Sequence, residues 1–155
     1  MNAHADLIAN FYQAFSRRDG AAMGACYHPA VHFSDPVFDL HGEHARAMWQ
    51  MLCARGRDLQ IEFRDVSAEG EHGRAHWDAA YTFSGTGRKV LNRIDAAFRF
   101  RDGLIVRHQD SFDFYRWSRQ ALGLPGLLLG WSSLLQSKVK DQAAQSLDAF
   151  MAEPR

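Results

Sequence analysis

The chain has 155 residues, the size of a single ordinary domain, and its 18 basic and 18 acidic side chains cancel. This balance argues against a nucleic-acid-binding protein, which would carry a basic patch, and against a polybasic protein of membrane surfaces. Hydrophobic residues make up 46% of the chain and aromatic residues 12%, which excludes a disordered chain.

The two cysteines, Cys26 and Cys53, are too few for a disulfide framework and form no Cys-x-x-Cys pair. The N-terminal residues lack the basic and apolar regions of a signal peptide. An uncharged stretch, residues 120–136, is slightly short for a bilayer and is broken by Pro125. We therefore expect a cytoplasmic protein with free thiols and no membrane contact.

The first third of the chain is mainly helical in its spacing of apolar residues. In chain order the pattern predicts a helix through Leu7 and Phe15 that ends at Asp19-Gly20, a short helix over 21–27 that His28-Pro29 stops, strands at 31–33 and 37–40 around Ser34-Asp35-Pro36, and a helix over 43–55.

Apolar and polar residues alternate after Gly56, which is typical of half-buried strands. The pattern predicts an antiparallel meander with strands around 59–63, at 74–84, at 89–101 and at 104–115. Helical spacing then resumes at 117–122, is interrupted by Leu124-Pro125-Gly126, and continues as one amphipathic helix from 127 to about 149. Three helices followed by a meander indicate an α+β fold.

The last predicted strand carries the clearest chemical signal. His108 and Asp110 lie in the middle of its apolar face, which also holds Leu104, Val106, Phe112 and Phe114. A buried carboxylate is costly without a partner, and His108 is two residues away on the same face. The pair is either an acid–base pair in a cavity or a structural ion pair.

The two preceding strands bear on that cavity. If Arg101-Asp102-Gly103 forms a three-residue hairpin loop, Ala96 faces His108 and leaves room for a ligand. Asp95 then lies on the charged outer face. In the strand over 74–84, hydrophobicity predicts that Trp77, Ala79, Tyr81 and Phe83 face inward, whereas a bulge would turn His76 and Asp78 inward instead.

The other polar residues give weaker signals. Asp35, before Pro36, is typical of a turn or cap. No histidine has a spacing to a second histidine or a carboxylate that predicts a metal site, and no phosphate-binding loop, dinucleotide fingerprint or nucleophile motif is present. The sequence therefore predicts neither a metal nor a cofactor.

Three segments resemble the nuclear-transport-factor-two-like superfamily, which includes ketosteroid isomerases, limonene epoxide hydrolases and SnoaL-like polyketide cyclases. They are Phe11-Tyr12-Gln-Ala-Phe15 with Asp19-Gly20, then Phe33-Ser-Asp35-Pro36, and then Phe98-Arg-Phe100-Arg-Asp102-Gly103-Leu-Ile105. The resemblance spans residues 5–115. It implies a cone, in which a curved antiparallel sheet wraps around helices and encloses a deep apolar pocket, and members are commonly homodimers.

The resemblance also implies roles for single residues. Asp35 matches the general base of the isomerases, but Phe11 and Ala96 stand where those enzymes have hydrogen-bond donors. Tyr12 is one residue away from the donor position and would point elsewhere. Asp110 matches a catalytic carboxylate of the epoxide hydrolases, whose second motif aligns with His76-Trp77-Asp78 only after a one-residue shift and without its arginine.

These observations predict a cone domain over residues 1–116 and a C-terminal helical extension over 117–155 packed on it. The expected function is a cofactor-independent acid–base enzyme (isomerase, epoxide hydrolase or cyclase type) for a small hydrophobic molecule, with Asp110, His108 and Asp35 as catalytic residues. The alternative is a binding protein that uses the same pocket without turnover. The residues expected to contact the molecule are Phe11, Phe15, Trp49, Trp77, Tyr81, Phe83, Ala96, Phe98 and Phe112.

Overall fold

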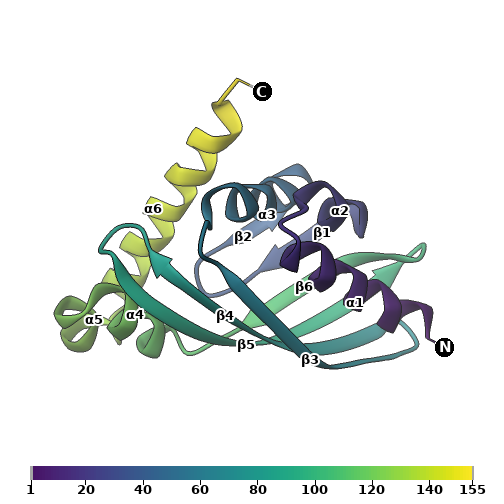
Figure 1. Ribbon diagram of the computed structural model, residues 1–155, viewed down its shortest axis with the longest axis horizontal. Coiled ribbons are helices and arrows are strands. Elements are labelled where there is room, and N and C mark those ends of the chain that lie inside the picture. The colour runs from purple at the N-terminus through teal and green to yellow at the C-terminus, as the bar shows by residue number, and fades with distance from the viewer. Residues whose placement is uncertain (1, 155) are drawn as a thin grey trace.

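One curved sheet with strand order β2-β1-β6-β5-β4-β3 carries α1, α2 and α3 on one face (Figure 1). The computed structural model describes residues 2–154 and has an α+β cone fold, as predicted. Its elements are α1 (Ala3–Ser16), α2 (Gly20–Ala25), β1 (Tyr27–Ser34), β2 (Asp39–His41), α3 (Glu43–Arg55), β3 (Gln60–Glu69), β4 (His72–Phe83), β5 (Arg88–Arg101), β6 (Leu104–Ser111), α4 (Phe114–Leu122), α5 (Leu124–Leu129) and α6 (Ser133–Ala152).

The concave face of the sheet and the helices share the main core. In α1 the Asn2 side chain accepts hydrogen bonds from the amides of His4 and Ala5, which caps the helix. The face of α1 that points to the sheet is buried and holds Ile8, Phe11, Tyr12, Ala14 and Phe15. In β5 every second residue from Val90 to Phe100 is buried, and the residues between them are exposed. The buried face of α1 and the buried residues of β5 therefore belong to one apolar interior.

The pairing of β5 with β6 differs from the prediction. Asp102 and Gly103 have φ of +55° and +75°, as a two-residue turn requires, so Arg101 pairs with Leu104. A bulge between Arg99 and Phe100 then shifts the register. The predicted three-residue loop, with Ala96 opposite His108, is therefore wrong.

The shifted register changes which side chains meet across the ladder. Phe98 lies opposite His108, and Ala96 lies opposite Asp110. The bulge also turns Ile105 into the core, where it is fully buried, and leaves Val106 half-buried. The small Ala96 side chain is thus beside the carboxylate rather than the imidazole.

Several predicted boundaries are corrected near the first two strands. The second helix ends at Ala25, and β1 begins at Tyr27, so His28-Pro29 belongs to a strand instead of stopping a helix. The second strand starts at Asp39 rather than at Val37. The reason is that the Asp35 carboxylate accepts hydrogen bonds from the amides of Val37 and Phe38, which keeps these residues in the turn.

The last strand is shorter than predicted because a helix begins early. β6 ends at Ser111, and the Asp113 side chain accepts a hydrogen bond from the Arg116 amide at the start of α4. Phe114 is therefore helical and is no part of the inner face of the strand. An N-cap of this kind favours helix over the extended backbone that the alternation had indicated.

The predicted helix over 127–149 is two helices. α5 ends at Leu129, and α6 begins at Ser133 with Ser132 as its cap. The late residues Leu147 and Phe150 are buried in the main core beside α3. Within residues 2–154 no helix has both the length and the apolar character needed to cross a bilayer.

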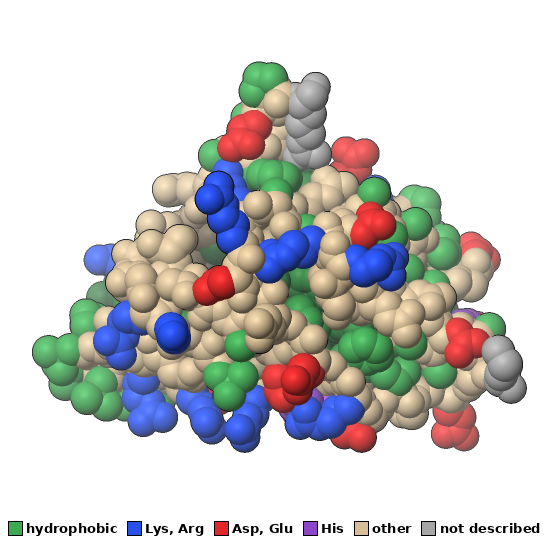
Figure 2. Space-filling view, viewed as in Figure 1, with side chains coloured by type: hydrophobic (Ala, Val, Ile, Leu, Met, Phe, Trp, Pro, Cys, Tyr) green, Lys and Arg blue, Asp and Glu red, His purple; other side chains and the backbone are tan. Residues whose placement is uncertain are grey.

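The break leaves an apolar row exposed at the α5 end of the molecule, where Figure 2 shows green side chains at the lower left. Trp131 is 76% exposed and Leu134 is 70% exposed, and the other members are Leu124, Leu127, Leu128 and Leu129. We call these six residues the apolar row. In this single chain the apolar row is therefore not covered by the rest of the domain.

Candidate functional site

A chain of buried hydrogen bonds connects α3, β1 and β6 inside the cone. The Trp49 indole Nε1 donates to the Tyr27 hydroxyl oxygen over 2.7 Å, and that hydroxyl lies 2.8 Å from Nδ1 of His108. His108 Nε2 lies 2.9 Å from Oδ1 of Asp110. His108 is fully buried and Asp110 is 4% exposed. The predicted partnership of His108 and Asp110 therefore exists, in the interior.

The chemistry of the four groups sets the direction of this chain. If the Asp110 carboxylate is ionised, it only accepts hydrogen bonds, and Nε2 of His108 must then carry a proton and donate to it. In a neutral imidazole Nδ1 then accepts, which requires the Tyr27 hydroxyl to donate to it. The Tyr27 oxygen is left to accept from Trp49, whose indole can only donate. With these protonation states every hydrogen bond of the chain runs towards Asp110. Each polar hydrogen in the chain then has an acceptor.

Aromatic side chains surround His108. The Phe98 ring centroid is 4.4 Å from that of the imidazole, and the Phe33 centroid is 5.0 Å away. The indole of Trp49 is stacked on the imidazole at 5.8 Å, and Phe11 meets it edge-on at 5.5 Å. This shell excludes water and lowers the local dielectric, which strengthens every interaction of the buried charge.

The predicted contact residues fall into three groups. Phe11, Trp49, Phe98 and Ala96 lie directly around His108 and Asp110, and Phe15 and Trp77 form the next layer against Trp49. Tyr81 and Phe112 are half-buried and bridge the main core and a smaller cluster at the α4 end. Phe83 packs only in that smaller cluster, against Trp117, and lies apart from His108.

Among residues 2–154 three buried side-chain donor atoms have no hydrogen-bond partner: the Tyr12 hydroxyl, the Trp77 indole Nε1 and Nη1 of Arg18. Tyr12 and Trp77 belong to the main core. Their ring centroids are 5.9 Å apart. Burial raises the pKa of Tyr12 well above its usual value, and the charge of Asp110 raises it further. An unpaired buried donor is costly, so this region is suited to accept an oxygen atom of a bound molecule.

Sequence reasoning missed Tyr12 and Tyr27 as members of the site. Tyr12 points to a different side of the interior from Phe11, as expected, but that side is also buried, beside Phe63 and Trp77. Its spacing of four residues from Ile8 was the available signal. Tyr27 gave no such signal, because the residue was placed at the end of a helix.

Asp35 stabilises the β1–β2 turn with its side chain and is half-buried. Its Oδ1 accepts from the amides of Val37 and Phe38 at 2.7 and 2.6 Å. Burial raises the pKa of Asp35 to about 7; the nearby charge of Asp110 adds to this, and the two backbone hydrogen bonds and Lys140 oppose it. Asp35 therefore exchanges its proton near neutral pH.

The C-terminal helices border the side of the cone where Asp35 lies. Gln136 of α6 donates to the Pro36 carbonyl over 3.0 Å, and the Trp117 indole of α4 donates to the Tyr81 hydroxyl over 2.7 Å. The pKa of Tyr81 is raised by burial and, less strongly, by the charge of Asp35. This end of the cone is thus formed jointly by the β1–β2 turn, β4 and the extension.

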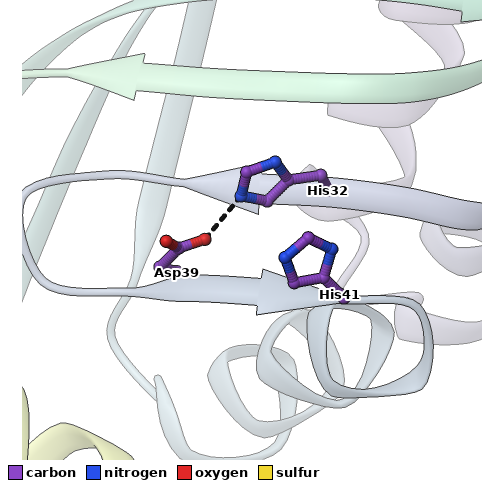
Figure 3. Close-up of side chains that lie close together, drawn as sticks. All are labelled: His32, Asp39 and His41. Atoms are coloured by element: carbon purple, nitrogen blue, oxygen red, sulfur yellow. Dashed lines mark hydrogen bonds and ion pairs between the residues drawn. The ribbon is translucent and has the colours of Figure 1, made fainter.

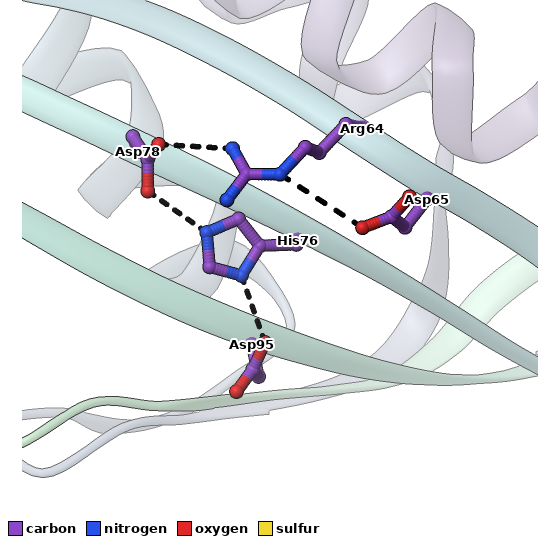
Figure 4. Close-up of polar contacts among 5 residues, drawn as sticks. All are labelled: Arg64, Asp65, His76, Asp78 and Asp95. Atoms are coloured by element: carbon purple, nitrogen blue, oxygen red, sulfur yellow. Dashed lines mark hydrogen bonds and ion pairs between the residues drawn. The ribbon is translucent and has the colours of Figure 1, made fainter.

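The outer face of the sheet carries a histidine–aspartate network around His76 (Figure 4). His76 Nε2 lies 2.8 Å from Asp78 and its Nδ1 lies 2.8 Å from Asp95, while Arg64 donates to Asp78 over 3.0 Å. Trp77 and Ala79 face inward, as hydrophobicity predicted. The alternative in which a bulge turns His76 and Asp78 inward is therefore wrong.

Two open hollows lie on the outside of the protein. One of about 670 Å³ covers the outer sheet face around Arg64, His76 and Asp95, and one of about 450 Å³ lies between α3 and the end of α6. Neither is lined by Asp35, His108 or Asp110. The deep apolar pocket stays a prediction.

The comparison with protein families decides the relationship of the chain. The SnoaL-like domain matches residues 8–108, which is more than half of the chain. The chain belongs to the SnoaL-like family. The resemblance to nuclear-transport-factor-two-like proteins is confirmed, and the match contains Tyr12, Tyr27, Asp35 and Trp49 and ends at His108. No curated protein matches the sequence.

Solved structures similar to this SnoaL-like protein share its fold at low identity. A nuclear-transport-factor-two-like protein of unknown function from Burkholderia pseudomallei is 21% identical, with 77% of this chain and 98% of that chain covered and a TM-score of 0.66. A candidate polyketide cyclase from Streptomyces antibioticus is 24% identical, with 78% and 99% covered and a TM-score of 0.64. An M. tuberculosis epoxide hydrolase resembling limonene epoxide hydrolase is 19% identical, with 82% and 96% covered and a TM-score of 0.63. At these identities the similarity shows the fold alone.

The substitution Tyr27→Phe tests the buried hydrogen-bond chain. It leaves the Trp49 indole and Nδ1 of His108 unpaired, so we expect the free energy of unfolding to fall by about 2–4 kcal/mol. Urea unfolding followed by circular dichroism measures this. Tyr115→Phe is the control, because the Tyr115 hydroxyl lies near the surface and donates only to the Leu127 carbonyl. A loss no larger than that of the control would contradict the contribution of these hydrogen bonds to stability.

The raised pKa of Asp35 predicts a pH-dependent stability. Between pH 4 and pH 7 the folded protein holds this proton more tightly than the unfolded chain does, so the contribution of Asp35 to stability is lost as pH rises through this window. Asp35→Asn keeps the oxygen that accepts from Val37 and Phe38 but cannot ionise. We expect the variant to match the wild type near pH 4 and to exceed it by about 1–3 kcal/mol at pH 8, a figure reduced for solvent screening.

The measurement is urea unfolding at a series of pH values. Asp148→Asn, at an exposed position of α6, is the matched control and should show a flat difference. A flat difference for Asp35→Asn as well would show that the Asp35 carboxyl group has an ordinary pKa.

Proposed function

We propose that this SnoaL-like protein is a cofactor-independent acid–base enzyme that acts on a small hydrophobic molecule inside the cone. The observation that carries the proposal is the buried Asp110 carboxylate, which a chain of hydrogen bonds holds in a core that also contains two unpartnered donors, the Tyr12 hydroxyl and the Trp77 indole. A protein rarely keeps a buried charge and unpaired donors together unless function requires them.

In the proposed mechanism Asp110 is the general base. It removes a proton from a carbon or a water molecule while His108 keeps the carboxylate oriented. Asp35 exchanges its proton near pH 7 and supplies a proton to, or takes one from, the other end of the reacting group. Negative charge that develops on a substrate oxygen is stabilised by the Tyr12 hydroxyl and the Trp77 indole.

The side chains around His108 and Asp110 support a class of substrate. Phe11, Trp49 and Phe98 offer apolar and aromatic surface around His108, and the unpartnered donors offer two hydrogen bonds. This combination fits a small, mainly apolar molecule with one oxygen function, such as a carbonyl or an epoxide. We propose that it enters past the half-buried Tyr81 and Phe112 at the α4 end, on the side where Asp35 lies.

The enzyme hypothesis predicts that Asp110→Asn removes turnover without removing binding. We expect saturable quenching of tryptophan fluorescence by at least one member of a panel of steroids, terpenoid epoxides and polyketide-like phenols. The variant should bind with an affinity within about tenfold of the wild type but convert the ligand about 10²- to 10⁴-fold more slowly, because it lacks the base. Product formation is followed by chromatography.

Asp95→Asn is the control for this experiment, since Asp95 is an exposed carboxylate that pairs with His76 on the outer face of the sheet. It should keep the wild-type rate. If wild type binds a ligand and no member of the panel is converted, the second candidate function gains support. If nothing binds, the site hypothesis fails.

The second candidate is a binding protein without turnover. It is favoured by Phe11 and Ala96, which stand where the isomerases that the chain resembles have donors, and by the nearly complete burial of Asp110. In that case the chain from Trp49 to Asp110 stabilises the cone and gives the interior a fixed polar group for a ligand. The rate measurement on wild type separates the two candidates.

We also propose that the protein forms a homodimer, as the family resemblance implies. The support in this structure is the apolar row, because a second copy would remove Trp131 and the leucines of α5 from water. Light scattering on a size-exclusion column should give twice the 17.6 kDa of one chain. The double variant Leu128→Ser, Trp131→Ser should shift this mass towards one chain, and an unchanged dimer would place the contact elsewhere.

We propose a cytoplasmic location from the two free thiols. Cys26 is buried and Cys53 is half-buried, and burial raises the pKa of both thiols, so they remain protonated and unreactive. Such cysteines suit a reducing compartment.

A further inference from the structure

The β1–β2 hairpin gathers two imidazoles and a carboxylate on one side (Figure 3). His32 and His41 are direct partners in the antiparallel register. Asp39 precedes His41 by two residues, so strand geometry puts both on the same face of β2. One ligand atom from each of the three residues lies within 4.8 Å of the others.

We propose that His32, Asp39 and His41 form a binding site for a divalent transition-metal ion such as Zn²⁺. Two imidazole nitrogens and one carboxylate oxygen are a ligand set that Zn²⁺ accepts, and three protein ligands leave a fourth position for water. The site lies outside the candidate active site. It is a surface site, because Asp39 and His41 are exposed and His32 is half-buried.

The three side chains must make small movements before they can share an ion. In a tetrahedral site with bonds of about 2.0–2.1 Å, neighbouring ligand atoms are about 3.3 Å apart. His32 Nε2 and Asp39 Oδ1 are now 2.5 Å apart and would separate slightly. The two imidazole rings are stacked, with centroids 4.1 Å apart and planes 13° apart, so they must tilt towards a shared ion. Side chains that are at least partly in solvent can make these movements at low cost.

The backbone beneath the three residues is held in place before an ion arrives. The Asp35 carboxylate closes the turn by accepting from two amides, and the Gly42 amide donates to the Val31 carbonyl at the other end of the hairpin. Arg107 of β6 donates to the His32 carbonyl and to the Ser34 hydroxyl. Little backbone conformational entropy therefore remains to be lost on binding.

The surrounding charges limit the expected affinity. The guanidinium of Arg107 is near Asp39 and, after the hydrogen bond from His32 and the charges of both histidines, adds to the lowering of the pKa of Asp39. A positive group beside the site opposes a second cation. We therefore expect a dissociation constant in the micromolar range rather than the tighter binding of a closed four-ligand site.

The test is isothermal titration of the full chain, free of any affinity tag, with ZnCl₂ in a non-coordinating buffer at pH 7.5. We expect one ion per chain and a dissociation constant below about 100 μM. His41→Ala and Asp39→Asn should each weaken binding at least tenfold. His72→Ala is the matched control, because His72 is exposed at the distant β3–β4 turn, and it should bind as the wild type does.

A second measurement locates the ion. On addition of Zn²⁺ the imidazole proton resonances of His32 and His41 should shift and those of His72 should not, and the midpoint of thermal unfolding should rise in the wild type but not in His41→Ala. The proposal is overturned if no saturable binding occurs below 1 mM. It is equally overturned if the two variants bind as tightly as the wild type.

Discussion

The hydrogen bonds from Trp49 through Tyr27 and His108 to Asp110 are the interaction on which the interior of this protein depends. They connect α3, β1 and β6, which are far apart in the sequence, through groups with almost no access to water. Each bond adds only about 1 kcal/mol, but a buried group left without its partner costs more than that. The same hydrogen bonds therefore fix both the packing of α3 against the sheet and the position of the Asp110 carboxylate.

The two carboxyl groups of the candidate site, those of Asp35 and Asp110, have different hydrogen-bond partners. Asp110 is held by an imidazole within the aromatic shell, whereas Asp35 is held by two backbone amides in a turn. Burial and, to a smaller extent, the charge of Asp110 raise the pKa of Asp35 to about 7, so Asp35 can donate or accept a proton near neutral pH. A site that performs acid and base steps without a cofactor needs such a group.

The fold itself does not choose a reaction, because the similar structures include a candidate cyclase, an epoxide hydrolase and a protein of unknown function. The interior of this chain holds two unpartnered donors, the Tyr12 hydroxyl and the Trp77 indole. The β1–β2 hairpin contributes to both proposed sites, because its turn carries Asp35 and its strands carry the proposed metal ligands.

The sequence by itself determined the fold family, the α+β class, the strict alternation of β5, the inward face of β4 and the burial of His108 and Asp110. All of these follow from periodicity within one element or from local motifs. Only the tertiary structure decided that Phe98 faces His108, that Tyr27 completes the hydrogen-bond chain and that His32 meets His41. A bulge changes the register without changing the alternation, and pairing between distant elements depends on which surfaces pack best. Contacts of that kind are properties of the assembled core, and no stretch of sequence contains them.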